Sequence, residues 1–194
     1  MLPKDARRFK SCRRFNEPGH VHSLTFSCFK RQPFLSKDRT RQWLVDALDS
    51  ARRKLGFQIW AYVIMPEHVH VVLYPGRERY EMSKILAAIK IPVTRRAVAF
   101  LSREDPSSLS VMNDVQPNGR VAHRFWQRGG GFDRNLIDTT SVHATIEYIH
   151  NNPVRRGLTQ SAVEWRWSSA AYFAGARNVP LSIDAESIPT LHPT

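Results

Sequence analysis

Apolar residues recur every two residues in some stretches of the chain and about every 3.6 residues in others, which predicts strands that alternate with helices. Alternation over residues 21–29 is typical of a half-buried strand with its apolar side chains on one face. Leucine and alanine then recur at helical spacing, so we expect a helix over residues 37–55. Ser36 is expected to cap the start of this helix, and Gly56 is expected to end it.

Two β-rich runs follow, over residues 57–65 and 69–74, with only Pro66, Glu67 and His68 between them. Such a short connection between apolar runs predicts an antiparallel hairpin. Apolar residues from 82 to 101 then return to helical spacing. Pro92 lies inside this second helix and is expected to kink or end it, because proline lacks the backbone N–H that a helix uses.

The last third of the chain is more polar. Residues 121–127 are predicted to form a further strand, and the three glycines at 129–131 are expected to interrupt the chain after it. Thr139 or Thr140 is expected to cap a short helix that Pro153 ends, because proline disfavours helical geometry in the residue before it. The core-facing stripe of this helix is expected to consist of Val142, Ile146 and Ile149.

The predicted order of strand, helix, strand, strand, helix and strand indicates an α+β fold. We expect a ferredoxin-like sandwich with a central antiparallel sheet and helices packed mainly on one face. The expected organisation is a basic N-terminal arm over residues 1–19, one domain over residues 20–175 and a C-terminal tail over residues 176–194.

Charge narrows the choice of partner. The 194 residues include 29 Lys and Arg against 17 Asp and Glu, a net charge of +12, which favours a polyanion over a small-molecule substrate. The longest apolar run, residues 59–65, is too short to span a bilayer, so we expect no membrane association and a cytoplasmic protein. Cys12 and Cys28 lack the spacing of metal ligands and are interpreted as ordinary thiols of a reducing compartment.

Two histidines at the start of the second hairpin strand are candidate metal ligands. His68 and His70 are two positions apart, so their side chains leave the same face of the strand with Cα atoms roughly 6.6 Å apart. Two imidazoles at that spacing can bind one divalent ion, although exposed histidines on a polar face would show the same pattern. His20 and His22 have the same spacing, and only the apolar flanks of the hairpin distinguish the later pair.

A tyrosine and an amide share one flank of the helix near residue 148. Tyr148 lies about 120° from the apolar stripe, and Asn152 falls on the same flank one turn later. These two residues are candidates for a reactive site. In the alternative interpretation, Tyr148 is a boundary residue and Asn152 caps the turn that Pro153 begins.

Four blocks of sequence, in order, resemble one protein family. They occupy residues 63–70, 125–128 with 132–134, 148–158 and 165–170. Together they are similar to the single-tyrosine HUH transposases, and in particular to the REP-associated tyrosine transposases, over residues 19–174. The fold of that family agrees with the sandwich expected from the periodicity.

The resemblance implies a site and an activity. His68 and His70 would be the paired metal-binding histidines for Mg²⁺ or Mn²⁺, and Tyr148 would be the nucleophile. Asn152 occupies the position at which many related transposases use glutamine as a third ligand, and it reaches one methylene less far. The implied reaction is cleavage and rejoining of single-stranded or hairpin DNA through a 5′-phosphotyrosine. We expect a monomer rather than a homodimer.

Basic residues near these motifs are candidates for binding DNA phosphates. Those expected to flank the site are Arg124, Arg128, Arg134, Arg155 and Arg156. Those expected on the second helix, where they would hold a hairpin stem, are Lys90, Arg95 and Arg96. Trp126, Trp165 and Trp167 are candidates for base stacking, but a core position is favoured because a small sheet needs aromatic side chains on its packed face.

Two other functions compete with this interpretation. A non-catalytic nucleic-acid-binding protein would have a similar sandwich, as RNA-recognition modules do, but the chain lacks their aromatic-rich K/R-G-F strand. A small metal-dependent hydrolase would use His68 and His70 with an activated water, and it would leave the residues around Tyr148 without a role.

Overall fold

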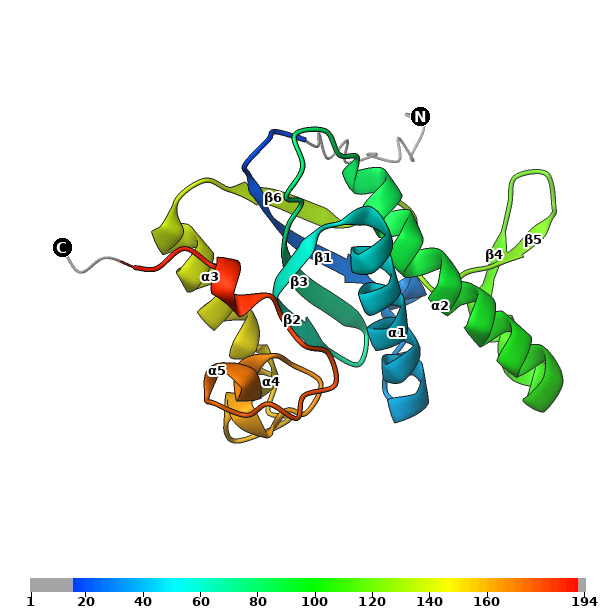
Figure 1. Ribbon diagram of the computed structural model, residues 1–194. Coiled ribbons are helices and arrows are strands. Elements are labelled where there is room, and N and C mark those ends of the chain that lie inside the picture. Colours follow the sequence, from blue (N-terminus) through cyan, green and yellow to red (C-terminus); the bar gives the residue numbers. More distant parts are fainter. Residues whose placement is uncertain (1–15, 192–194) are drawn as a thin grey trace, which may run out of the picture.

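A four-stranded antiparallel sheet forms the centre of the computed structural model, which describes residues 16–191 (Figure 1). The strand order across the sheet is β2-β3-β1-β6. The strands are β1 (Val21–Ser27), β2 (Gln58–Ile64), β3 (His68–Tyr74) and β6 (Phe132–Leu136). The first fifteen residues of the predicted basic arm, which include Cys12, lie outside the described part of the chain.

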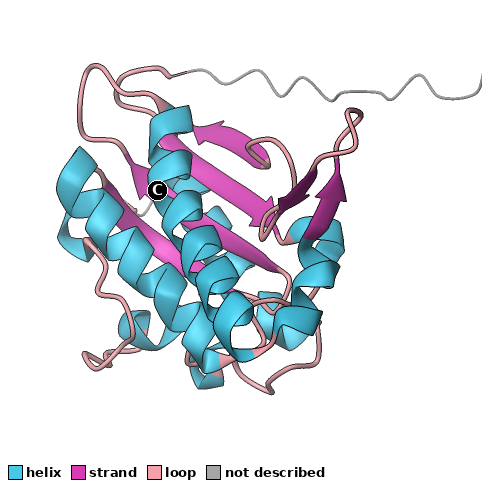
Figure 2. Ribbon diagram, turned by 90° about the vertical axis from the view of Figure 1, so that its right-hand side faces the viewer, coloured by secondary structure: helices cyan, strands magenta, loops and turns pink. Residues whose placement is uncertain are grey.

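Helices cover both faces of the sheet. The two long helices, α1 (Asp38–Leu55) and α2 (Met82–Glu104), lie side by side on one face (Figure 2), and α3 (Thr139–His150) lies on the other. The short helices are η1 (Phe29–Arg31), η2 (Pro106–Met112), α4 (Asn152–Arg155), η3 (Ala162–Glu164), α5 (Ala170–Phe173) and η4 (Ala185–Ser187). The predicted ferredoxin-like α+β sandwich is confirmed, with α3 on the face opposite to the two long helices.

The two faces of the sheet carry cores of different size, and strand alternation assigns each side chain to one of them. Leu24, Phe26 and Val71 belong to the larger core under α1 and α2. Val72 and Ile146 belong to the smaller core under α3. The smaller core covers only part of its face, so polar side chains can form a site on the rest of that face.

The starts of two helices differ from the predictions. The residue before α1 is Lys37 and makes no side-chain cap, whereas the hydroxyl of Ser36 donates to the carbonyl of Pro33 at 2.7 Å. Asp138, and not a threonine, caps α3, because its carboxylate accepts from the backbone N–H of Ser141 at 2.7 Å. Gly56 ends α1 with φ of 70°, as predicted.

The second helix does not end at Pro92. It continues to Glu104, and Val93 and Ala97 beyond the proline are buried on the same core as Ile89 before it. Packing on both sides of the proline thus outweighs the lost hydrogen bond.

The prediction of the fourth strand was wrong. Within residues 121–127, only Val121–His123 is a strand, β5, and it pairs with β4 (Asn113–Val115) in a hairpin apart from the central sheet (Figure 1). The strand beside β1 is β6 instead. Periodicity could not reveal β6, because it lies at the sheet edge and only Leu136 in it is buried.

The segment over residues 176–191 packs on the edge of β2 instead of extending as a tail. Leu181 and Ile183 are buried in the larger core. The backbone N–H of Asp184 donates to Ile59 O at 2.8 Å, and its carboxylate accepts from Ile59 N–H at 2.8 Å. This segment therefore covers a strand edge that would otherwise be exposed.

The three tryptophans that were candidates for base stacking have structural roles. Trp126 and Trp167 are buried in the larger core, Trp165 packs against it, and each indole N–H donates a hydrogen bond within the protein. The prediction of core positions is confirmed. Cys28 is a buried free thiol, and burial raises its pKa to about 12. No helix within residues 16–191 is long and apolar enough to cross a membrane.

Candidate active site

His68 and His70 lie on the face of the sheet that carries α3. In the register of β3 with β1, His70 is opposite Thr25 and His68 is opposite Ser27. The two imidazoles meet edge to face, with Nε2 atoms 3.0 Å apart. The strand therefore aims one nitrogen of each ring at a common point.

The other nitrogen of each ring has an oxygen partner. His68 Nδ1 lies 3.2 Å from Oε1 of Glu67, and His70 Nδ1 lies 2.8 Å from Oγ1 of Thr25. When each Nδ1–H donates to its oxygen, both Nε2 lone pairs face each other. A cation between the rings satisfies both lone pairs, and without a cation a change of tautomer gives a hydrogen bond from one Nε2 to the other.

Electrostatics keep both rings neutral at pH 7. Burial, together with smaller effects of His68 and Arg155, lowers the pKa of His70 to about 3. Burial also lowers the pKa of His68, against the opposing effect of the Glu67 carboxylate. Neutral imidazole is the form that binds metal ions.

The histidine pair fits a divalent ion. Two nitrogens that bind one ion at about 2.1 Å and at a right angle to each other are about 3.0 Å apart, which agrees with the 3.0 Å between the two Nε2 atoms. Within residues 16–191, no group of three His, Cys, Asp or Glu side chains is placed to hold a metal.

Asn152 closes the end of α3. Its amide nitrogen donates to the carbonyls of Tyr148 and Ile149 at 3.2 Å each, and its Oδ1 accepts from Arg155 at 3.2 Å. These contacts close the end of α3, which differs from the predicted cap of the turn that Pro153 begins, because Asn151 precedes α4 (Asn152–Arg155) and Asn152 is its first residue. A role for Asn152 as metal ligand stays a prediction, and it requires that Oδ1 exchange the guanidinium for the ion.

Tyr148 shares a cavity with His70. The cavity has a volume of about 580 Å³, and Thr25 and Arg134 also line it. The Tyr148 side chain is 54% exposed, so its hydroxyl is accessible to a substrate. Two residues that are 78 positions apart in the sequence thus line one cavity, because α3 packs on the sheet that contains β3.

Two arginines after α3 extend toward this site. The guanidinium of Arg155 stacks on the Tyr148 ring, 3.9 Å from its centroid, and also donates to the Tyr148 carbonyl at 3.4 Å. Arg156 forms an ion pair with Glu67 at 2.9 Å. The turn after the tyrosine helix is therefore connected to the turn that carries the histidines.

The predicted basic residues separate into two groups. Arg134, Arg155 and Arg156 lie at the Tyr148 site, as expected. The residues Lys90, Arg95, Arg124 and Arg128 line a different cavity, of about 290 Å³, between α2 and the segment that follows β5. For Arg124 and Arg128 this corrects the prediction that they flank the Tyr148 site.

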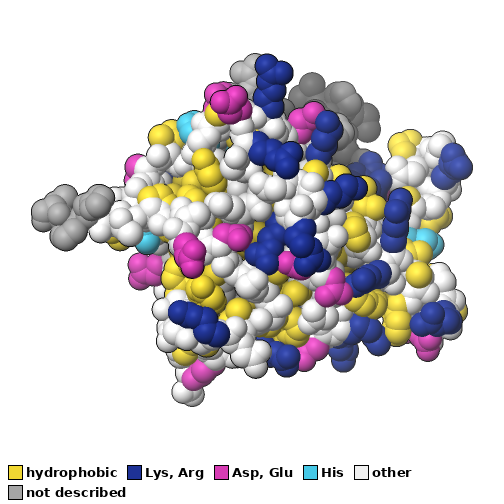
Figure 3. Space-filling model, viewed as in Figure 1, with side chains coloured by type: hydrophobic (Ala, Val, Ile, Leu, Met, Phe, Trp, Pro, Cys, Tyr) yellow, Lys and Arg dark blue, Asp and Glu magenta, His cyan; other side chains and the backbone are white. Residues whose placement is uncertain are grey.

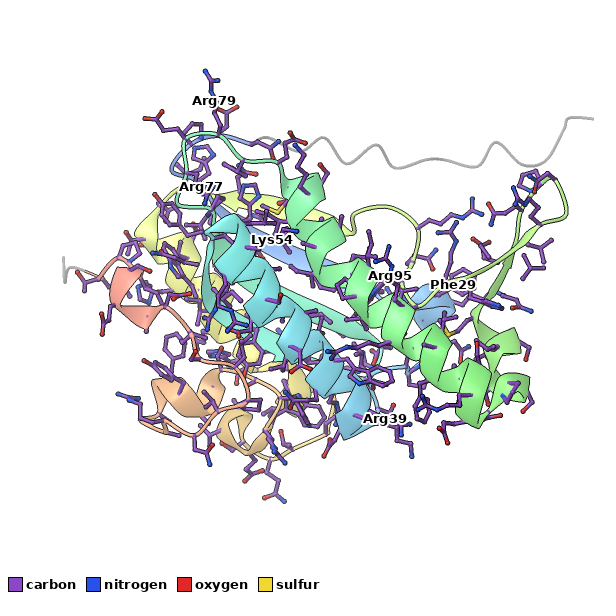
Figure 4. All side chains as sticks on the ribbon, turned by 45° about the vertical axis from the view of Figure 1, so that its right-hand side comes forward. Phe29, Arg39, Lys54, Arg77, Arg79 and Arg95 are labelled. Atoms are coloured by element: carbon purple, nitrogen blue, oxygen red, sulfur yellow. The ribbon has the colours of Figure 1, made fainter. Side chains whose placement is uncertain are left out.

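The second basic region extends over the outer helices. Arg96 lies in the groove between α1 and α2, where it pairs with Asp46 at 2.6 Å. Arg124 and Arg128 both pair with Asp114. Lys and Arg side chains gather over the face formed by α1 and α2 (Figure 3), and Arg95 projects from α2 (Figure 4). This face is opposite to the one that carries α3.

Sequence reasoning missed two residues of the site. Glu67 is adjacent to His68 in the sequence, and a carboxylate beside a candidate ligand is a usable signal. Thr25 contacts His70 only because of the register between β1 and β3, which no local pattern in the sequence reveals.

Comparison with known proteins found relatives in sequence and in fold. No protein-family model matches the chain. A Haemophilus influenzae protein provisionally named a REP-associated tyrosine transposase is 24% identical over 140 residues, which are 69% of this chain and 74% of the relative. The REP-associated tyrosine transposase of Escherichia coli is 24% identical over 128 residues, 66% of this chain and 63% of the relative.

A solved structure shares the fold. The structure of a REP-associated tyrosine transposase bound to a REP hairpin superposes with a TM-score of 0.62 at 20% identity, and the match covers 94% of this chain and 98% of that one. At this identity the match bears on the fold alone, and the curated relatives supply the agreement in sequence. The chain therefore resembles the REP-associated tyrosine transposases in both sequence and fold.

Proposed function

We propose that this protein is a transposase-like enzyme that cleaves and rejoins single-stranded DNA beside a hairpin. The names of its curated relatives support a DNA-processing role of this class. The observation that carries the proposal is that Tyr148 and His70 line one cavity, with the Nε2 atoms of His70 and His68 3.0 Å apart.

In the proposed step, the Tyr148 oxygen attacks a backbone phosphorus of the DNA. The bond from phosphorus to the 3′ oxygen breaks, the leaving oxygen gains a proton to become a 3′-hydroxyl, and the tyrosine proton passes to water. The product is a 5′-phosphotyrosine. One phosphodiester replaces another, so a second 3′-hydroxyl can reverse the step and join new strands without ATP.

The proposed cofactor is Mg²⁺ or Mn²⁺, held by His68 and His70. A bound ion of this kind acts as a Lewis acid on the phosphate oxygens where charge develops. Asn152 is the proposed third protein ligand, with water or substrate oxygens completing the set. Imidazole ligands favour manganese over magnesium, so we expect Mn²⁺ to bind more tightly.

The basic residues of the site are proposed to hold the substrate. Arg134 in the cavity and Arg155 on the tyrosine ring are in position to neutralise phosphates next to the cleaved bond. The basic cavity beside α2 and the groove between α1 and α2 are separate surfaces, which we assign to the hairpin stem. One protomer contains every residue named for the reaction, which favours a monomer.

The deciding experiment is a search for a covalent protein–DNA adduct. Wild-type protein with Mn²⁺ and single-stranded hairpin DNA should give an adduct that survives denaturing electrophoresis. Tyr148→Phe should give none and should bind the hairpin as the wild type does, since the change removes one oxygen from a half-exposed side chain. Equal cleavage by the two proteins would exclude Tyr148 as the nucleophile.

The same experiment tests the alternative of a non-catalytic DNA-binding protein. The contacts of Asn152 are compatible with that alternative, because its amide nitrogen donates to the last carbonyls of α3 and its Oδ1 accepts from Arg155. Tight hairpin binding by the wild type with no adduct in Mn²⁺ or Mg²⁺ would establish the binding function and overturn the enzymatic one.

A further inference from the structure

Glu67 occupies the turn between β2 and β3, next to the histidine pair. Its carboxylate is within reach of two partners at once, Nδ1 of His68 at 3.2 Å and the guanidinium of Arg156 at 2.9 Å. We infer that Glu67 is a positioning residue that holds His68 in the orientation and tautomer required for metal binding. The inference rests on the proposed function, because it assigns Glu67 a part in that same site.

The backbone at this turn is held on both sides. Glu67 O accepts from the N–H of Cys28 at 2.8 Å, and Pro66 O accepts from the N–H of Leu35 at 2.9 Å. Met65 N–H donates to His68 O at 2.9 Å and closes the hairpin. The Glu67 side chain therefore starts from a fixed position, and it is only 12% exposed.

The geometry at His68 sets the direction of its proton. A carboxylate only accepts, so Nδ1 of His68 must carry the hydrogen in this contact. Nε2 is then left with its lone pair toward His70, 3.0 Å away. Histidines that bind metals usually donate the other ring N–H to a carboxylate or carbonyl, and loss of that partner costs about 10-fold to 100-fold in metal affinity.

Thr25 provides the matching contact for the second histidine, but with a neutral oxygen. Its Oγ1 lies 2.8 Å from Nδ1 of His70. The two rings are thus held by different groups, one charged and one uncharged.

Arg156 holds the Glu67 carboxylate from the side of the tyrosine helix. The backbone N–H of Arg156 donates to Asn152 O at 3.1 Å, and that of Asn151 donates to Glu147 O at 3.1 Å. Two helical hydrogen bonds therefore span the turn between Tyr148 and Arg156. From there the ion pair between Arg156 and Glu67 and the contact of Glu67 with His68 connect this turn to the histidine pair.

Isothermal titration of the purified protein with Mn²⁺, without DNA, tests the inference directly. Glu67→Ala should weaken Mn²⁺ binding about 10-fold to 100-fold. Glu67→Gln should recover most of the affinity, because its amide oxygen still accepts from Nδ1 of His68. Glu78→Ala, at an exposed glutamate in the loop after β3, is the matched control and should bind Mn²⁺ as the wild type does.

A variant at Arg156 separates the orientation of His68 from the ion pair of Glu67. In Arg156→Gln the contact between Glu67 and His68 remains, so Mn²⁺ affinity should fall less than in Glu67→Ala. Wild-type affinity in Glu67→Ala, or a larger loss in Arg156→Gln than in Glu67→Ala, would overturn the inference. Circular dichroism of each variant confirms that the comparison is made between folded proteins.

The adduct assay keeps this inference distinct from the proposed function. An adduct in the wild type, together with undiminished Mn²⁺ binding in Glu67→Ala, would overturn the role of Glu67 and leave the enzymatic function intact. Weakened Mn²⁺ binding in Glu67→Ala, with no adduct in the wild type, would support the role of Glu67 and overturn the enzymatic function.

Discussion

Two pairs of histidines with the same spacing lie on neighbouring strands, and only one of them forms a candidate metal site. His22 lies in β1 with His20 just before it, whereas His68 and His70 lie in β3, which pairs with β1. The sequence pattern is identical, yet the environments have little in common. The difference lies in which ring nitrogens already have partners.

The ring of His22 has no nitrogen left for a ligand. It is fully buried under α2, with Nδ1 2.7 Å from the Asp133 carboxylate and Nε2 2.6 Å from the Tyr80 hydroxyl. His20 is turned to another partner, the amide of Asn135 at 3.0 Å. This first pair therefore connects β1, β6 and the start of α2, and it serves the fold.

The later pair shares one face of β3 and keeps one nitrogen of each ring available. Glu67 and Thr25 contact the Nδ1 atoms of the two rings. The two Nε2 atoms lie 3.0 Å apart, and His70 lines an open cavity. Spacing brings two histidines to one face, but partners and access decide whether they form a site. The predictions below test this contrast, from the largest expected effect to the smallest.

The largest effect is expected from His70→Ala. Loss of one of two protein nitrogens should reduce Mn²⁺ affinity more than about 100-fold and abolish the adduct. Hairpin binding, measured by fluorescence anisotropy in EDTA, should remain close to that of the wild type. An adduct formed at the wild-type rate by His70→Ala would remove the distinction between the two histidine pairs.

The matching change in the first pair should lower the stability of the fold and leave metal affinity unchanged. His22→Ala removes the shared partner of Asp133 and Tyr80 from a buried position, which should cost about 2–4 kcal/mol of unfolding free energy. Urea denaturation measures this loss. Mn²⁺ affinity of the folded variant should equal that of the wild type, and a parallel loss of affinity would show that the first pair contributes to the site.

Added Mn²⁺ should stabilise the wild-type protein against thermal unfolding. At a free concentration 100 times the Kd, the gain is about 2.7 kcal/mol. His22→Ala should show the same gain from its lower starting point, whereas His68→Ala should show almost none. A gain of equal size in His68→Ala would mean that the ion binds elsewhere on the protein.

The smallest effect is expected at His20. Its contact with Asn135 is a single hydrogen bond at a partly exposed position, so His20→Ala should change the unfolding free energy by less than about 1 kcal/mol. Adduct yield should stay at the wild-type level. Loss of the adduct in His20→Ala would show that the early histidines take part in catalysis after all.

Periodicity and turn residues were sufficient for the elements that bury apolar side chains. The first strand, the hairpin and the helices α1 and α3 all have one continuous apolar face, and each was predicted within a few residues. The blocks around His68 and Tyr148 also indicated the family resemblance that the comparisons support. These features depend on residues close in sequence, so they can be recognised before the chain is folded.

What the sequence determined by itself was a set of candidate reactive residues and the strand or helix that carries each one. Only the tertiary structure decided that β6 completes the sheet, that Arg124 and Arg128 line a cavity away from Tyr148, and that Asn152 is turned toward Arg155. The physical reason is that local periodicity records the burial of apolar side chains. It says little about where an edge strand, a surface charge or a polar side chain will lie. Their positions follow from contacts between segments far apart in the chain, and so did the difference between the two histidine pairs.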